Sequence, residues 1–454
     1  MLRGLAAGRR GGPGAAALLV LLLASCSSTP AAPTRARTAT PAPAPAGSAS
    51  APAPAGPPGA VTSLARRFAA QTASGDFAAQ WPEMAPQARA LWPSEAARTA
   101  MLTAKFAGAP IASISVGTPV GGATWYDPES PAVSVTGTWR FPLALSFADP
   151  TALQPPGVAA LFSMTTLSIT GATAGSPRVV GEGPASMDAP LIVPASITPR
   201  SVHVPIFMYH LVEDRTPQES AYGGNTYGWR IDVGLTTLTS QFQSEMAAAH
   251  AIGATSISLQ HLGDALLYGL PLPPHAFVVT FDDARLSQWV DAVPILRRYG
   301  FTAVFFPCTD LVGGVYPPQR YMTAAELRDL AATGFSFGDH TLNDQTALWY
   351  ASAPELSALT ERSKSVLEAL TDQPIQFIAY SAVWPRAWPQ SGPGPSAETS
   401  LLRTLSGFGY LGGLQDLPFD TSLDVSTQLW QLPRVRVGLG VTTAGWLSFV
   451  QSAA

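Results

Sequence analysis

The stretch Val278-Val279-Thr280-Phe281-Asp282-Asp283 determines how the rest of the chain is interpreted, because an apolar run ends abruptly in two adjacent carboxylates. A short apolar run that contains β-branched residues predicts a buried strand. Parallel α/β folds place catalytic groups at the carboxyl ends of their strands, so Asp282 and Asp283 are candidates for a site at that edge. One carboxylate can bind a metal while the other accepts a proton from water. The alternative is an Asp-rich turn without chemical function.

Residues 204–454 alternate short apolar runs with amphipathic segments, which is the rhythm of βα units. Two capping boxes begin helices at Thr323 and Ser352, and Gly300 is placed to end a third helix. We predict strands over residues 204–209, 255–259, 278–283, 303–306, 335–338, 375–380 and 435–437. Polar groups follow several of these strands, among them His210 and His340. The pattern predicts a barrel-like parallel α/β domain with its chemistry at the strand ends.

Five short motifs follow one another in these residues: Val204-Pro205-Ile206-Phe207-Met208-Tyr209-His210, Thr280-Phe281-Asp282-Asp283, Gly338-Asp339-His340-Thr341, Phe377-Ile378-Ala379-Tyr380 and Leu432-Pro433-Arg434-Val435-Arg436-Val437. In this order and spacing the sequence resembles the NodB-type polysaccharide deacetylases, carbohydrate esterase family four, over about residues 204–454. The resemblance implies a distorted (β/α) barrel that hydrolyses the amide bonds of an N-acetylated cell-wall or surface polysaccharide with a divalent metal.

The resemblance also implies roles for particular residues. Asp282 would be the general base, and Asp283 and His340 would be metal ligands. The backbone amide of Ala382, in Ser381-Ala382, would polarise the acetyl carbonyl as an oxyanion donor does.

Asp344 is the main departure from the family, which has a second histidine four residues after the first. A carboxylate is a legitimate zinc ligand, and positions four apart share a face if the segment is helical, so Asp344 is a third candidate ligand beside His340. Two carboxylates would neutralise a divalent ion and favour harder metals. We therefore expect a divalent ion, either zinc or a harder ion such as manganese, cobalt or magnesium.

Other departures bear on catalysis. No histidine follows His340, so the late histidine that protonates the leaving amine in many relatives is absent. The alternative to an active enzyme is therefore a catalytically inactive glycan-binding module on the same fold. His210 follows a strand of the same barrel and is a candidate to assist at the site. Arg434 or Arg436 would lower the pKa of Asp282 if it lay close by.

Several other side chains near the strand ends have two interpretations. Tyr380 and Trp384 are candidates for substrate binding, since flat rings stack on sugars, and loop packing accounts for Trp384 equally well. Cys308 follows an apolar run and is interpreted as a buried small hydrophobe.

The N-terminus has the features of an export signal. Arginines precede the apolar run 15–23, and Leu23-Ala24-Ser25-Cys26 resembles the lipobox of bacterial lipoproteins, with Cys26 as the lipidated residue. Residues 27–59 are rich in Pro, Ala, Ser and Thr, which is typical of a disordered tether. We expect an exported protein, anchored by lipid to the cell membrane and facing the cell wall or periplasm.

Residues 60–198 predict a smaller accessory α+β domain. Helices are expected near Leu64 to Phe77 and over 97–106, and strands over 111–116, 132–147 and 163–171. A chain of 454 residues with 46% hydrophobic content is long enough for two such domains. Its net charge of −4 argues against a nucleic-acid partner, and we expect a monomer.

Overall fold

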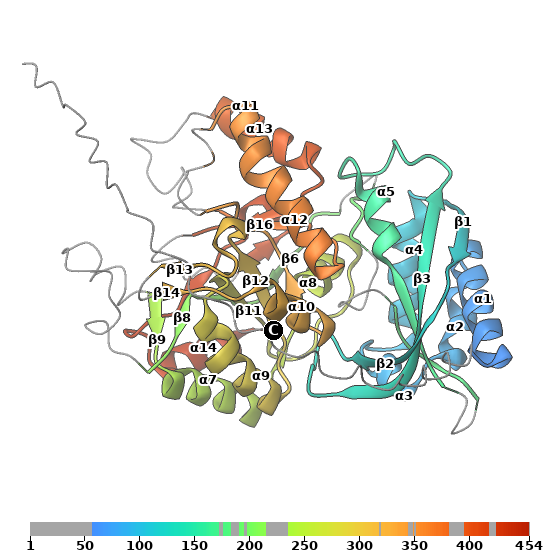
Figure 1. The fold of residues 1–454 in the computed structure, drawn as a ribbon, viewed down its shortest axis with the longest axis horizontal. Coiled ribbons are helices and arrows are strands. Elements are labelled where there is room, and N and C mark those ends of the chain that lie inside the picture. Colours follow the sequence, from blue (N-terminus) through green and yellow to red (C-terminus); the bar gives the residue numbers. More distant parts are fainter. Residues whose placement is uncertain are drawn as a thin grey trace, which may run out of the picture. The chain divides into compact units, whose positions relative to one another are not determined.

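The computed structural model describes residues 57–171, 176–182, 190–194, 198–214, 235–316, 319–343, 348, 351–380, 395–416 and 424–453. Residues Pro54–Ala454 pack as one compact unit. Its N-terminal part combines helices with an antiparallel sheet, and its C-terminal part is built on parallel strands (Figure 1). The division into domains near residue 200 stays a prediction.

The N-terminal part contains a five-stranded sheet with the order β1-β3-β4-β5, and β2 pairs with β3. Within the described residues, all pairs of neighbouring strands in this sheet are antiparallel. Its helices and strands are α1 (Gly59–Ser74), α2 (Phe77–Gln80), α3 (Pro86–Ala90), α4 (Glu95–Ala107), β1 (Ile111–Val116), β2 (Val120–Tyr126), β3 (Ser134–Phe147), α5 (Val158–Leu161), β4 (Thr166–Thr170) and β5 (Val179–Glu182). The predicted helix over 97–106 and the three predicted strands are confirmed as α4, β1, β3 and β4, whereas β2 and β5 were not predicted.

Parallel strands form the centre of the C-terminal part. Among the described residues these are β7 (Ile206–Tyr209), β11 (Ala276–Asp283), β12 (Val304–Pro307), β15 (Ser336–Phe337), β16 (Phe377–Ala379), β17 (Gly412–Leu414) and β19 (Val435–Arg436). Five of them pair in the order β15-β12-β11-β7-β19, the short strand β10 (Thr255–Ser256) also pairs parallel with β11, and β16 pairs with β17. β11 therefore lies at the middle of the sheet, as its apolar sequence predicts.

Two isolated bridges close these strands into a ring. Asp339, two residues after β15, accepts a hydrogen bond from the backbone N–H of Ala379 in β16 (2.8 Å). Leu432, just before β19, donates its N–H to the carbonyl of Gly413 in β17 (3.0 Å). The ring is a barrel that is closed at these two places by a single bridge each. The predicted α/β class and distorted barrel are therefore confirmed.

Alternating residues of the strands face two different cores, because successive side chains of a strand point to opposite sides. Val278 belongs to a buried cluster with strand residues from around the ring, which marks the barrel interior. Val279 and Phe281 belong to a second cluster that includes residues of the outer helices. Asp282 lies four residues after Val278 and points to the same side of the strand, so it faces the barrel interior at the carboxyl end of β11.

The helices of the C-terminal part pack against the strands of the barrel. They are α7 (Thr239–Ala251), α8 (Leu259–Tyr268), α9 (Val293–Tyr299), α10 (Ala324–Ala332), α11 (Ala353–Leu356), α12 (Arg362–Thr371), α13 (Pro395–Gly407) and α14 (Thr443–Ser452). Both predicted capping boxes are present, at Thr323 before α10 and at Ser352 before α11. Figure 1 shows α7, α9 and α14 grouped on one side of the barrel. The Trp446 ring of α14 stacks on Phe207 of β7, with centroids 4.4 Å apart.

Short elements complete the described chain. The remaining strands are β6 (Ser201–His203), β8 (Leu211–Val212), β9 (Thr236–Thr237), β13 (Val315–Tyr316), β14 (Gln319–Arg320) and β18 (Asp424–Ser426). Single turns of 3₁₀ or π helix lie at Trp81–Glu83, Phe162–Met164, Gln288–Ala292, Thr309–Leu311, Ser357–Glu361 and Leu429–Gln431.

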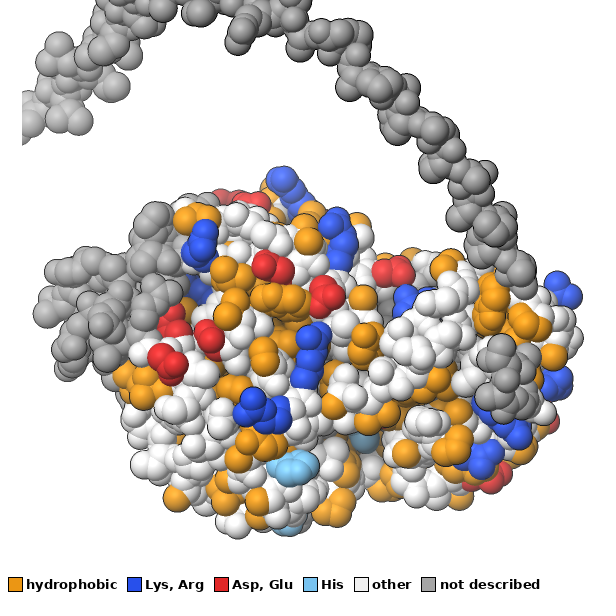
Figure 2. Space-filling model, turned by 60° about the horizontal axis from the view of Figure 1, so that its bottom comes forward, with side chains coloured by type: hydrophobic (Ala, Val, Ile, Leu, Met, Phe, Trp, Pro, Cys, Tyr) orange, Lys and Arg blue, Asp and Glu red, His pale blue; other side chains and the backbone are white. Residues whose placement is uncertain are grey.

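The surface offers two further observations. No helix within the described residues has both the length and the apolar character needed to cross a membrane. On the face drawn in Figure 2, basic and acidic side chains are scattered among uncharged ones.

Candidate active site

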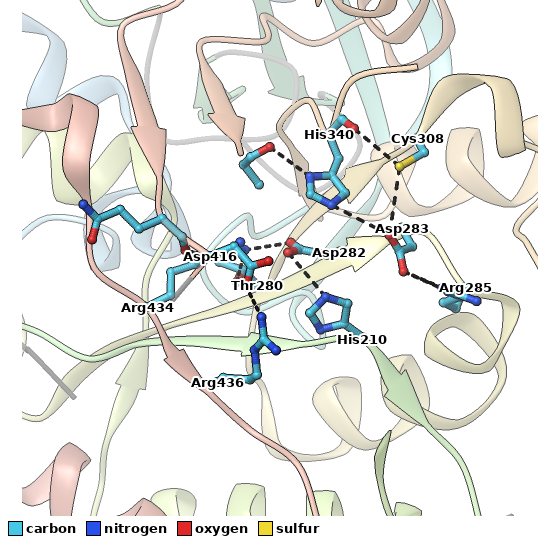
Figure 3. Close-up of polar contacts among 12 residues, drawn as sticks. His210, Thr280, Asp282, Asp283, Arg285, Cys308, His340, Asp416, Arg434 and Arg436 are labelled. Atoms are coloured by element: carbon cyan, nitrogen blue, oxygen red, sulfur yellow. Dashed lines mark hydrogen bonds and ion pairs between the residues drawn. The ribbon is translucent and has the colours of Figure 1, made fainter. Parts of the chain in front are cut away.

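The carboxyl end of β11 brings Asp282 and Asp283 to the mouth of the barrel, between the ends of β7 and β12. Phe281 pairs with Tyr209 of β7, so the next residues, Asp282 and His210, are neighbours. Figure 3 shows His210, Asp282, Asp283 and His340 gathered at this edge. All four side chains are buried.

Arg434 is the cation that contacts the predicted base. Its Nη1 donates to Asp282 Oδ1 at 2.7 Å, and its Nε donates to the carbonyl of Gln415 at 2.8 Å. Both Asp282 and Arg434 are at least 99% buried. Burial alone would raise the pKa of Asp282, but the neighbouring cations, Arg434 foremost, outweigh it and hold that pKa well below its usual range. Asp282 is therefore a carboxylate throughout the physiological range.

His210 lies on the other side of Asp282. Its Nε2 is 3.8 Å from Asp282 Oδ2, which is too long for a hydrogen bond. The Gln288 side chain holds the two backbones together by donating to the carbonyls of His210 (2.7 Å) and Asp282 (2.6 Å). Burial lowers the pKa of His210 more strongly than the nearby carboxylates raise it. The imidazole is therefore neutral at neutral pH.

Asp283 is held in an unusual backbone conformation. Its φ is +73° and that of Ala284 is +56°, a left-handed region that residues other than glycine seldom adopt. Arg285 donates to Asp283 Oδ2 from Nε (2.9 Å) and from Nη2 (2.8 Å). The other oxygen, Oδ1, lies 3.7 Å from His340 Nε2. Burial opposes ionisation of Asp283, but Arg285, His210 and His340 together lower its pKa.

His340 has one ring nitrogen fixed by the barrel itself. Its Nδ1 lies 2.9 Å from the carbonyl of Ala379 in β16, so Nδ1 carries the proton and Nε2 faces Asp283. The turn that presents His340 is held by Asp339, whose carboxylate accepts from Ser363 Oγ (2.6 Å) and Tyr410 Oη (2.5 Å). Burial raises the pKa of Asp339 to about 6. Asp339 is a positioning residue that the sequence did not single out.

Cys308 also belongs to this cluster, which the sequence did not predict. Its Sγ lies 4.0 Å from Asp283 Oδ1 and donates to the carbonyl of His340 at 3.4 Å. The register explains this position. Phe305 pairs with Phe337, so Cys308, three residues later, is level with His340. A signal was available, because Cys308 follows its strand as Asp283 and His340 follow theirs.

The other predicted site residues are placed differently or are not described. Arg436 pairs with Asp416, whereas Arg434 contacts Asp282. Tyr380 is fully buried, and its hydroxyl donates to the carbonyl of Trp430 (3.0 Å), so a role in substrate binding stays a prediction. Cys26, Asp344, Ala382 and Trp384 lie outside the described residues.

The donors at the mouth fit a divalent metal. Asp283 Oδ1, His340 Nε2 and Cys308 Sγ lie within 4.8 Å of one another, and each is a type of atom that binds such ions. Beside them, Asp282 Oδ2 is buried and has no hydrogen-bond partner among the described residues. A buried carboxylate oxygen is costly to leave unsatisfied, so a water molecule or substrate group is expected to bind there.

Comparison with known proteins agrees with these motifs. Residues 270–382 match the polysaccharide deacetylase family model. The Bacillus subtilis (strain 168) protein YxkH, provisionally named a polysaccharide deacetylase, is 21% identical over 255 residues, which are 56% of this chain and 78% of that protein.

Two solved structures are also similar. The Streptococcus pyogenes deacetylase PplD, in complex with acetate, is 22% identical, with a TM-score of 0.44 over 56% of this chain and 99% of that one. IcaB from Ammonifex degensii is 17% identical, with a TM-score of 0.42 over 55% of this chain and 98% of that one. The sequence motifs and the family match to residues 270–382 together show that the chain contains a polysaccharide deacetylase domain.

Proposed function

We propose that the protein removes acetyl groups from an N-acetylated polysaccharide of the cell wall or cell surface by metal-dependent hydrolysis. The observation that carries this proposal is the pairing of two groups at the mouth of the barrel. The ionised Asp282 is held by Arg434, and the adjacent residue, Asp283, belongs to a cluster of side chains that can bind a metal. A carboxylate base beside a Lewis acid is suited to the hydrolysis of an unactivated amide.

The chemical step uses Asp282 as the base. Its carboxylate takes a proton from water as the water oxygen bonds to the acetyl carbon, and the carbon–nitrogen bond then breaks to give acetate and an amine. Asp283 and His340 would hold the divalent ion, which supplies the Lewis acidity that polarises the acetyl carbonyl. Because its pKa is low, Asp282 is always ionised but weakly basic, so it depends on that acidity.

The leaving amine must receive a proton. We propose that His210 passes the proton from Asp282 to the nitrogen, since its Nε2 lies 3.8 Å from Asp282 Oδ2 and a small ring movement would bring the two atoms into contact. Its neutral state at neutral pH leaves it able to accept the proton.

An inactive glycan-binding module is the second candidate, and Arg285 favours it. The guanidinium makes two contacts with Asp283 Oδ2 and so places a positive charge beside the carboxylate that would bind the metal. This cation competes electrostatically with a divalent ion.

Acetate release from acetylated glucosamine oligomers, with and without added divalent metal, separates the two candidates. The hydrolase releases acetate only when metal is present, and Asp282→Asn abolishes the release. Glycan binding without acetate release under any metal would establish the inactive module instead.

For location, we propose export and lipid anchoring through Cys26, supported by the Leu23-Ala24-Ser25-Cys26 sequence. Cys26→Ser should move the protein from the membrane fraction to the soluble fraction. An unchanged membrane fraction would rule out the lipid anchor.

A further inference from the structure

Three side chains from three neighbouring strand ends point atoms of different chemistry at one place. Asp283 is the last residue of β11, Cys308 comes directly after β12, and His340 comes shortly after β15. Asp283 Oδ1 is 3.7 Å from His340 Nε2 and 4.0 Å from Cys308 Sγ. Figure 3 shows the sulfur and the imidazole on the same side of Asp283. All three residues are at least 97% buried.

Two of these side chains, those of His340 and Asp283, are oriented by hydrogen bonds through the atoms that point away from the cluster. The Nδ1 of His340 is bonded to the carbonyl of Ala379, and Asp283 Oδ2 is bonded to Arg285. These contacts turn Nε2 and Oδ1 toward Cys308. Outer contacts of this kind are what fix the ligands of protein metal sites.

The distances fit a bound ion after a small contraction. Zinc bonds to oxygen, nitrogen and sulfur of about 2.0 to 2.3 Å at tetrahedral angles place the ligand atoms about 3.3 to 3.7 Å apart. The observed separations are 3.7 Å and 4.0 Å, and all three atoms lie within 4.8 Å of one another. The two pairs that include Asp283 need to contract by a few tenths of an ångström, and the His340–Cys308 pair by at most about 1.2 Å, so side-chain rotations would complete the site.

We propose that Cys308 binds the catalytic divalent ion as a thiolate, together with Asp283 and His340, and that the sulfur makes the site selective for a thiophilic ion such as zinc. The inference deepens the proposed function, because it assumes that a metal binds at this mouth. Binding displaces the thiol proton to solvent, and the two anionic ligands then balance the charge of the ion. Sulfur is a poor ligand for magnesium and manganese, so the harder ions that Asp344 favours bind less well.

The test uses a protein in which one thiol remains. The chain has two cysteines, so the full-length Cys26→Ser protein retains Cys308 alone. After loading with zinc, X-ray absorption should show one sulfur at about 2.3 Å in addition to nitrogen or oxygen at about 2.0 to 2.1 Å. The cobalt-loaded protein should show a sulfur-to-cobalt charge-transfer band in the near ultraviolet.

Two variants in the same background separate the possible ligands. Adding Cys308→Ser should remove the sulfur shell and the charge-transfer band, whereas Asp344→Ala should keep both. Circular dichroism checks that each variant is folded, and the measurement on the single-thiol protein itself does not depend on either variant.

The outcomes distinguish this inference from the proposed function. A zinc-loaded single-thiol protein with only nitrogen and oxygen ligands overturns the role of Cys308, even if acetate is released. A sulfur shell without acetate release supports Cys308 as a ligand and counts against the hydrolase. A protein that takes up neither zinc nor cobalt under any loading overturns the inference as well.

Discussion

At the scale of single residues, Arg434 controls the charge of the proposed base. Its guanidinium lies 2.7 Å from Asp282 Oδ1 in a site without solvent exposure. Arg434→Ala removes the charge that lowers the pKa of Asp282 most strongly, so that pKa rises. The acid limb of the rate–pH profile should move upward by about 1 to 3 pH units, the range for a carboxylate that loses a close cation.

The matched control for this prediction is Arg436→Ala. Arg436 lies two residues along the same strand end but pairs with Asp416, so its removal should leave the acid limb in place. If Arg434→Ala does not move the limb, Asp282 is not the group whose ionisation limits the reaction at low pH.

At the scale of elements, a buried acid links helix α7 to strand β7. Glu245 accepts hydrogen bonds from Tyr209 Oη (2.8 Å) and Gln241 Nε2 (2.9 Å), and burial raises the pKa of Glu245 from 4.5 to about 7. The folded state therefore favours the protonated acid. The contribution of Glu245 to the free energy of unfolding is fully present below pH 4.5 and is lost as the pH rises to about 7. The free energy of unfolding falls by about 3 kcal/mol over this range for this reason.

The variant Glu245→Gln tests this pH dependence because it keeps an oxygen acceptor and cannot ionise. Its free energy of unfolding, measured by urea titration at several pH values, should exceed that of the wild type increasingly between pH 4.5 and 7. The exposed Asp310→Asn serves as a control that should run parallel to wild type. A constant difference between Glu245→Gln and wild type across this range would refute the assignment.

At the scale of the whole molecule, a buried ion pair joins the N-terminal part to the barrel. Lys105 Nζ of α4 lies 3.4 Å from Asp264 Oδ1 of α8, and neither side chain has solvent exposure. Removing one partner of a buried pair leaves a charge poorly compensated. Asp264→Ala should therefore lower the free energy of unfolding by about 3 to 5 kcal/mol, whereas Lys105→Met with Asp264→Leu should cost much less.

The pair Arg67–Glu83 on the surface of the same part provides the comparison. The Arg67 side chain is 54% exposed, so Glu83→Ala should change the free energy of unfolding by less than about 1 kcal/mol. If the single Asp264 variant is as mild as this surface variant, the ion pair does not hold the two parts together.

Local sequence patterns were sufficient to predict many of the helices and strands and their ends. The apolar run before Asp282 and Asp283, the capping boxes at Thr323 and Ser352, and the end of α9 at Gly300 all depend on residues a few positions apart. Helix periods, strand runs and caps act over that range, so one sequence suffices to read them. The rule that catalytic groups follow parallel strands then indicated Asp282, Asp283 and His340.

Which side chains come into contact at the site depends on tertiary packing. The pairing of Phe305 with Phe337 sets Cys308 level with His340, and packing of the late strand end brings Arg434 rather than Arg436 to Asp282. The barrel closes through single bridges at Asp339 and Leu432, which leave no run of paired residues to detect. Register between strands distant in sequence depends on how all the side chains of a core pack together, and no local pattern contains that information.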